Sequence, residues 1–199
     1  MGEPKFRAME TSAIRRENKT EKRELQGKLK IWIVEDQHFP KIILLNAVKT
    51  NFGEFFENFK NGEGVFLVDN FADAQKILES EDLKNNIILL DNRLPETRSP
   101  KSKLESSTKD ADLKEFDPSA FEIYEDDLEH LGNTAVDGYA LIEQFKSKGA
   151  TVIGTSSMDE DEIHSKGLGM PDFQIGKKFS EAKEGLAGIK ETILDRMEA

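Results

Sequence analysis

The chain has 199 residues, no cysteine and a formal net charge of −11, from 39 acidic and 28 basic side chains. This length suits one domain with a sizeable core, and the missing cysteines exclude disulfides, thiolate zinc sites and sulfur nucleophiles. The acidic balance argues against nucleic-acid or anionic-membrane partners, and without a long apolar run or a secretory signal core we expect a soluble cytoplasmic protein.

The strand and helix patterns follow a charged segment, 1–28, which we expect to be a mobile or loosely helical tail ahead of a domain spanning 29–199. Strands are predicted at 30–34, 65–68, 86–90, 151–155 and 173–176. Helices are predicted from Pro40 to Phe59 with an interruption at Gly53, at 72–80, 138–148 and 159–166, and from a Ser180 cap onward, with a core face of Ala182, Leu186, Ile189, Ile193 and Met197. Five strands alternating with helices predict an α/β fold with a doubly wound parallel sheet and right-handed crossovers.

Polar residues follow four of the predicted strands. Glu35 and Asp36 follow the first strand, Asp91 the third, Ser156 the fourth and Lys177 the fifth. Because the carboxyl ends of parallel strands meet at one edge of the sheet, we expect these five side chains to share a crevice.

These residue types suit one kind of chemistry. Three carboxylates repel one another unless a cation joins them, and oxygen ligands without cysteine favour Mg²⁺. A carboxylate beside Mg²⁺, a hydroxyl and a lysine suits phosphoryl transfer to an aspartate, with Asp91 attacking in line while the metal and Lys177 neutralise the phosphoryl oxygens. The simpler alternative is that Asp91 only hydrogen-bonds its own turn before Pro95.

Together these motifs resemble the receiver domain of two-component response regulators. The matched motifs are the acidic pair Glu35-Asp36, the phospho-acceptor turn from Asp91 to Pro95, the Asp137-Gly138 pair, Ser156 after the fourth strand, and Lys177-Lys178-Phe179. The resemblance implies a flavodoxin-like receiver fold of strand order 2-1-3-4-5.

The resemblance also implies roles for the site residues. Asp91 would accept a phosphoryl group from a histidine kinase or histidine phosphotransfer protein, with Ser156 and Lys177 completing the catalytic set. Mg²⁺ would be held by Glu35, Asp36, Asp91 and the backbone carbonyl of Arg93. The domain would catalyse only its own phosphorylation and dephosphorylation, and its output would be binding to a downstream protein.

Some positions depart from the family pattern or have alternatives. Thr155 is the alternative to Ser156, and Lys178 to Lys177. Lys178 also replaces the proline that usually follows the site lysine. The position of the aromatic conformational reporter falls on Gln174, with Phe173 one residue away.

A long insertion, 97–135, separates the phospho-acceptor turn from Asp137. Its first part is rich in Ser, Lys and Thr and is predicted to be flexible. Its second part predicts a short amphipathic helix after Asp117-Pro118. The insertion is either a tolerated surface loop or a lid or partner-docking element beside the site.

Three other functions compete. A degenerate receiver would bind partners without phosphorylation, but the motif set is complete. A phosphatase of the dehalogenase type would need an acid two residues after the nucleophile, where Arg93 stands. A nucleotide-binding fold is disfavoured because no Gly-rich phosphate loop follows the first strand.

Overall fold

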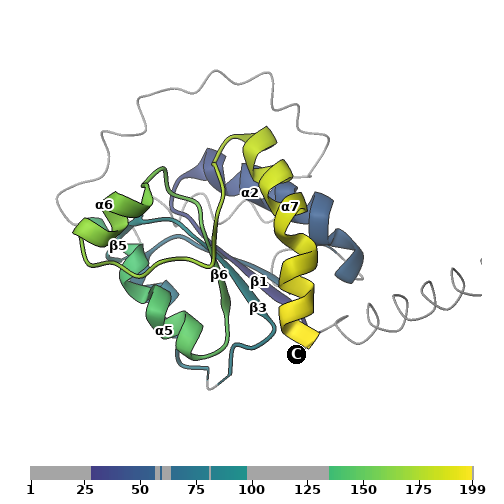
Figure 1. Ribbon diagram of the computed structural model, residues 1–199, viewed down its shortest axis with the longest axis horizontal. Helices are drawn as coiled ribbons and strands as arrows, with labels where there is room; N and C mark the ends of the chain where they lie inside the picture. Colours follow the sequence, from purple (N-terminus) through teal and green to yellow (C-terminus); the bar gives the residue numbers. More distant parts are fainter. Residues whose placement is uncertain (1–27, 57–58, 60–63, 81, 98–134, 199) are drawn as a thin grey trace, which may run out of the picture.

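A computed structural model describes residues 28–56, 59, 64–80, 82–97 and 135–198 (Figure 1). The predicted tail at 1–28 and the predicted insertion at 97–135, including its helix, lie almost wholly outside the described residues. Within the described part, no helix combines the length and apolar character that crossing a membrane requires.

The centre of the fold is a parallel five-stranded sheet in the order β2-β1-β3-β6-β7. Its strands are β2 (Val65–Val68), β1 (Lys30–Val34), β3 (Asn86–Leu90), β6 (Thr151–Gly154) and β7 (Phe173–Gln174). The prediction of an α/β fold with a parallel five-stranded sheet is confirmed. The predicted order was 2-1-3-4-5. The observed labels differ because two further short strands, β4 and β5, come before the last two strands of the sheet in the chain.

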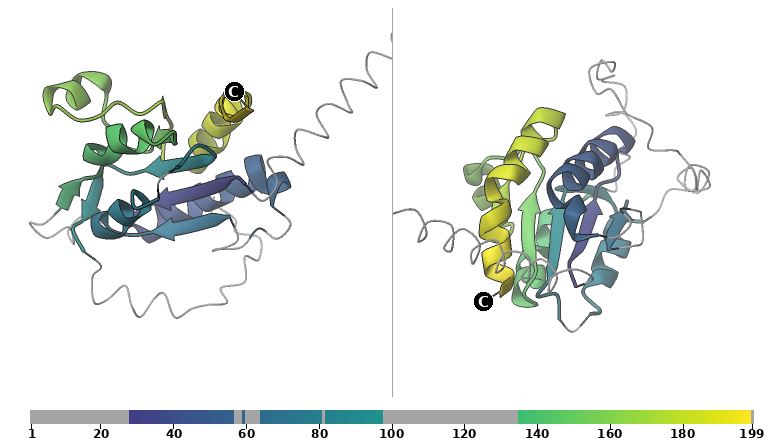
Figure 2. Two further views of the ribbon diagram at one scale, coloured as in Figure 1. Left: turned by 90° about the horizontal axis from the view of Figure 1, so that it is seen from below. Right: turned by 90° about the vertical axis from the view of Figure 1, so that its right-hand side faces the viewer.

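Helices cover both faces of this sheet, because the apolar run of β3 alternates between them. Ile87 and Leu89 pack into a core with α2 (His38–Phe52) and α7 (Phe179–Glu198), which lie side by side (Figure 2). The intervening Ile88 and Leu90 pack into a second core with other elements. These are α3 (Phe71–Ile77), the 3₁₀ turn η4 (Gly138–Leu141), α5 (Ile142–Ser147) and α6 (Glu160–Ser165). All five residues of β3 are buried, as expected of a central strand covered on both sides.

The first helix differs from its prediction at both ends. It begins at His38, two residues before Pro40, since proline is tolerated in the first helical turn. It ends at Phe52, and the 3₁₀ turn η1 (Gly53–Phe55) follows. The predicted interruption at Gly53 is therefore confirmed.

The segment from β7 to α7 shows two corrections. The predicted strand at 173–176 ends already at Gln174, and at Gly176 a Cβ would run into the side chain of Glu181. The helix begins at Phe179, with the Ala182 N–H donating to the Lys178 carbonyl at 2.8 Å. Ser180 is thus the second residue of the helix and not its N-cap, so that prediction was wrong. The predicted core face is confirmed.

Two short strands that were not predicted form a separate antiparallel ribbon next to the third strand of the sheet. They are β4 (Arg93–Pro95) and β5 (Ala135–Asp137). The register pairs Arg93 with Asp137 and Pro95 with Ala135. The chain therefore leaves this ribbon at Pro95, four residues beyond Asp91, and re-enters it at the paired Ala135.

Candidate functional site

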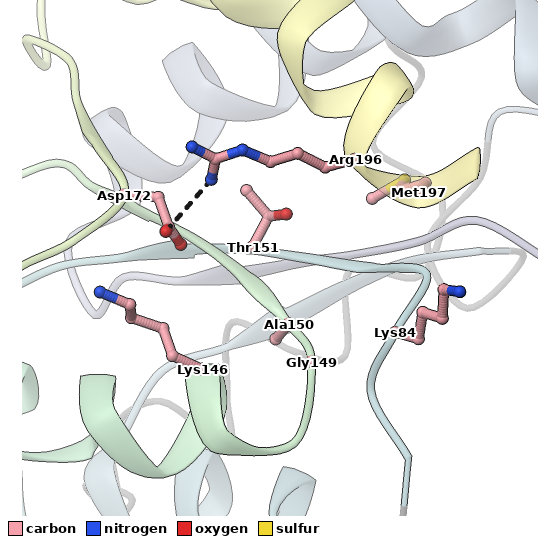
Figure 3. A pocket seen from close by; sticks show the side chains of 8 residues that line it. All are labelled: Lys84, Lys146, Gly149, Ala150, Thr151, Asp172, Arg196 and Met197. Atoms are coloured by element: carbon pink, nitrogen blue, oxygen red, sulfur yellow. Dashed lines mark hydrogen bonds and ion pairs between the residues drawn. The ribbon is translucent and has the colours of Figure 1, made fainter. Parts of the chain in front are cut away.

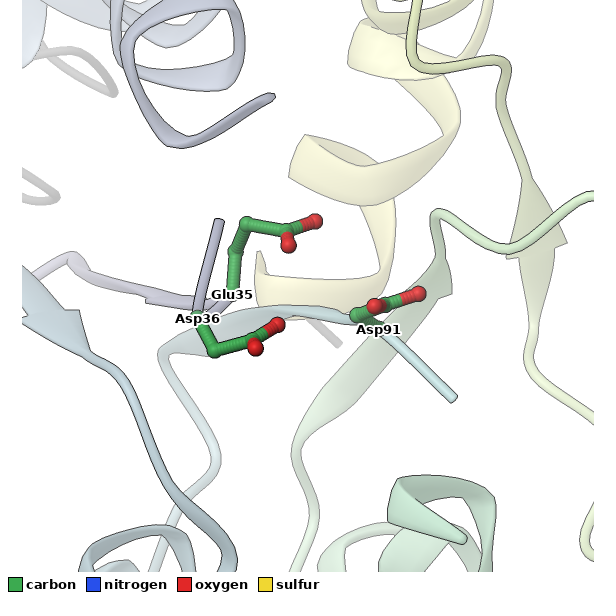
Figure 4. A group of neighbouring side chains, drawn as sticks. All are labelled: Glu35, Asp36 and Asp91. Carbon is green, nitrogen blue, oxygen red and sulfur yellow. The ribbon is translucent and has the colours of Figure 1, made fainter. Parts of the chain in front are cut away.

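Three carboxylates meet where two adjacent strands end. Glu35 and Asp36 follow β1, and Asp91 follows β3, with the Asp91 N–H donating to the Val34 carbonyl at 3.0 Å. One carboxylate oxygen from each acid lies within 4.8 Å of the others, and the three side chains gather at the strand ends (Figure 4). The structure thus brings together the three acids that the sequence predicted to converge.

Lys177 joins this group from the loop between β7 and α7. Its Nζ lies 2.8 Å from Glu35 Oε2 and 2.9 Å from Asp91 Oδ1. Lys178, the alternative candidate, pairs instead with Glu181 on the surface at 3.3 Å. Of the two lysines, the structure places Lys177 at the carboxylates.

Burial shapes the protonation of the acidic pair. Desolvation, with the negative charge of Asp91 added to it, raises the pKa of Glu35 to about 7, although Lys177 opposes the change. Desolvation also raises the pKa of Asp36, again reinforced by Asp91. Burial alone would lower the pKa of Lys177, but Glu35 and Asp91 outweigh it and raise that pKa. Once the three acids ionise, the site therefore holds more negative charge than the ammonium of Lys177 balances.

A hard divalent cation fits this arrangement. Asp36 Oδ1 is buried and has no hydrogen-bond partner within the described part of the chain. Buried carboxylate oxygens are usually paired, and an oxygen-rich group of three acids is the donor set that Mg²⁺ prefers. Glu35, Asp36 and Asp91 are thus suited to hold a metal ion. The Arg93 carbonyl stays a predicted fourth ligand.

No protein-family model and no curated protein matches this sequence. The resemblance to receiver domains therefore depends on the motifs of the sequence and on the geometry of the site.

Residues that directly follow the insertion stabilise the turn after Asp91. The Gly138 N–H donates to the Asn92 carbonyl, and a Cβ at Gly138 would collide with the Asp91 carbonyl oxygen. Asn92 Nδ2 donates to Asp137 Oδ1 at 3.2 Å. The Asp137-Gly138 motif thus has a local physical reason: only glycine lets the chain pass this close to the Asp91 main chain.

Ser156 and Thr155 follow β6 at the same edge of the sheet. Thr155 is wholly buried, and its Oγ1 has no hydrogen-bond partner among the described residues. Ser156 is half-buried, and its Oγ accepts a hydrogen bond from the Met158 N–H at 3.2 Å. The nearby Tyr139 hydroxyl accepts from the Ser156 N–H at 3.3 Å, and burial raises the pKa of this tyrosine. Sequence reasoning missed Tyr139, because nothing in its spacing indicates that its hydroxyl reaches this loop.

A hollow of about 220 Å³ lies at the opposite end of the sheet, where β6 begins (Figure 3). Arg196 Nη1 pairs there with Asp172 Oδ1 at 3.2 Å, and Asp172 Oδ2 accepts the Val152 N–H at 2.9 Å. Lys146 donates to the Met170 carbonyl at 3.1 Å. Because Arg196, Asp172 and Lys146 already have partners within the protein, we assign no ligand to this hollow.

Proposed function

We propose that this chain is a phosphoryl-accepting receiver of a two-component phosphorelay, with the flavodoxin-like receiver fold. The observation that supports it best is that Lys177 contacts both Glu35 and Asp91, with the Asp36 carboxylate close to those two acids. A nucleophilic carboxylate beside a cation-binding acidic pair and an ammonium is the arrangement that phosphoryl transfer to aspartate requires.

In the proposed reaction, a carboxylate oxygen of Asp91 attacks the phosphorus of a phosphohistidine. The P–N bond breaks, the imidazole leaves with its electron pair and takes up a proton, and Asp91 becomes an acyl phosphate. Lys177 stabilises the negative charge on the transferring group, and Ser156 would donate a hydrogen bond from its hydroxyl to a phosphoryl oxygen. Mg²⁺, held by Glu35, Asp36, Asp91 and the Arg93 carbonyl, would neutralise further charge on that group. Water later hydrolyses the acyl phosphate.

The partners follow from this chemistry. The donor is a histidine kinase or a histidine phosphotransfer protein in the cytoplasm, and the output is binding to a further protein once Asp91 carries the added charge. The insertion at 97–135 begins and returns beside Asp91, so we propose that it contributes to partner choice. The alternative function is a binding module that needs no phosphorylation.

The test is intact mass spectrometry of the full chain after incubation with acetyl phosphate and Mg²⁺. We expect one phosphoryl group on the wild type, none on Asp91→Asn, and none on the wild type with a chelator. Asp195→Asn, which removes an exposed acid on α7, is the matched control and is expected to label normally. Labelling that survives in Asp91→Asn, or no labelling of the wild type, would refute the proposal, and the second result would favour the binding module.

A further inference from the structure

The loop that carries Ser156 is held from outside by two side chains. The Tyr139 hydroxyl accepts from the Ser156 N–H at 3.3 Å. On the other side, Gln174 Nε2 donates to the Ser156 carbonyl at 2.8 Å and to the Met158 carbonyl at 2.5 Å. One amide group therefore fixes the main chain on both sides of residue 157.

Both anchors belong to segments that also touch the candidate site. Gln174 ends β7, pairs with Gly154 in the sheet, and stands three residues before Lys177. Tyr139 follows directly after Gly138, which packs against the Asp91 carbonyl. Its own hydroxyl occupies the place where a Cβ at Gly154 would lie. The loop is thus linked to Asp91 through two separate segments.

The hydroxyl of Ser156 is engaged within the loop. Its Oγ accepts from the Met158 N–H, and no hydrogen bond joins it to Asp91 in the described structure. Because Gln174 donates to the carbonyls on both sides of residue 157, a displacement of the Ser156 main chain away from β7 would break these bonds. Neutral hydrogen bonds of this kind stabilise a conformation modestly, so one or two of them suffice to bias a loop between two positions.

We propose that Gln174 is a positioning residue that holds the Ser156 loop in its unphosphorylated arrangement and so opposes capture of a phosphoryl group at Asp91. This inference rests on the proposed function of the site. Gln174 touches no reacting atom; it acts through the main chain of Ser156 and Met158. Removing its amide donor is expected to free the loop and strengthen binding of a phosphoryl mimic.

The experiment is a calorimetric titration of the full chain with beryllofluoride at saturating Mg²⁺. Gln174→Glu and Gln174→Leu both remove the donor and keep approximately the same size, and Gln144→Glu and Gln144→Leu repeat these changes at an exposed position on α5. We expect both Gln174 variants to bind beryllofluoride about fivefold more tightly than wild type, the size expected for one or two neutral hydrogen bonds. Affinity for Mg²⁺ alone should stay unchanged, which a general disturbance of the site would not allow.

The outcomes separate the two proposals. If wild-type protein does not bind beryllofluoride with Mg²⁺, the receiver function fails, and the role of Gln174 fails with it. If wild type binds and the Gln174 variants bind equally or more weakly, the receiver function stands and the role of Gln174 is overturned. Tighter binding in Gln174→Glu alone would assign the effect to added charge and would also overturn it.

Discussion

The two ends of the central sheet treat their charged side chains in opposite ways. At the amino end, Asp172 accepts a main-chain N–H and pairs with the half-exposed Arg196. At the carboxyl end, Lys177 contacts two acids, of which Glu35 is wholly buried, and Asp36 Oδ1 has no hydrogen-bond partner in the described structure. At the amino end Asp172 and Arg196 pair with each other, whereas at the carboxyl end three acids gather around Lys177.

The difference shows which end is built for a ligand. Burying like charges costs stability unless something compensates them, so such an arrangement persists where a function requires it. The amino end has more basic side chains and the hollow, yet Arg196 and Asp172 pair there and Lys146 donates to a backbone carbonyl. Buried carboxylates whose charge is not fully compensated therefore locate the candidate site better than the presence of a hollow does.

The largest effect on stability is expected when the ammonium group of Lys177 is removed from the acidic end of the sheet. In metal-free protein at pH 8, Lys177→Ala should lower the free energy of unfolding by about 2–3 kcal/mol, because it leaves buried carboxylates unpaired. The partial exposure of Lys177 keeps the loss from being larger. Lys178→Ala, beside it on the surface, should change little. Urea unfolding measures both, and equal losses in the two variants would contradict the comparison.

The pH dependence of stability gives an effect of similar size. The pKa of Glu35 is about 7 in the fold and 4.5 in the reference state, so the folded protein binds this proton more tightly. Its contribution is complete below pH 4.5 and is lost as pH rises through about 7, by an amount on the order of 3 kcal/mol in metal-free protein.

Glu35→Gln should flatten this part of the stability profile, which thermal unfolding from pH 4.5 to 8 would show. Glu143→Gln, at an exposed position on α5, should keep the wild-type profile. A Glu35→Gln protein that follows the wild-type curve would show that another group carries the pH dependence.

A smaller effect concerns the metal. Asp36→Ala should weaken Mg²⁺ binding at least about tenfold, equivalent to about 1.4 kcal/mol, because it removes one of three converging carboxylates. Trp32 fluorescence, from a residue on the strand that leads to Glu35, is the measurement. Asp161→Asn, on the exposed side of α6, is the control. Unchanged affinity in Asp36→Ala would remove the acidic pair from the metal site.

The smallest effect is expected at the amino end of the sheet. Arg196→Ala should cost no more than about 1 kcal/mol, because the ion pair with Asp172 is partly exposed, and Mg²⁺ affinity should not change. Chemical denaturation and the same fluorescence titration test the two statements. A weakened metal site in Arg196→Ala would mean that the two ends are coupled and would undo the contrast between them.

Local patterns in the sequence were enough to predict the sheet and the meeting of the acids. The apolar run before Asp91 and the β-rich run before Glu35 each identify a strand by themselves, and parallel pairing then places their carboxyl ends together. From the sequence, the candidates for the site lysine were Lys177 and Lys178. Only the fold shows that Lys177 is the one that contacts the acids.

Features that depend on distant contacts were not predictable. The pairing of β4 with β5 joins residues about 40 positions apart, and neither three-residue segment carries a strand pattern of its own. Gln174 looked like a missing aromatic, while its hydrogen bonds to the Ser156 loop depend on where the edge strand lies. The Ser180 cap failed because the helix had already begun at Phe179.

The β4–β5 ribbon makes this position a natural attachment point. Pro95 and Ala135 pair with each other in the ladder. The length of chain between them therefore has little effect on the geometry of the sheet. Closing a longer loop costs little further entropy once its ends are fixed. A circularly permuted fluorescent protein inserted between these two residues would therefore be attached four positions after Asp91, where its fluorescence could report a change of charge at the aspartate.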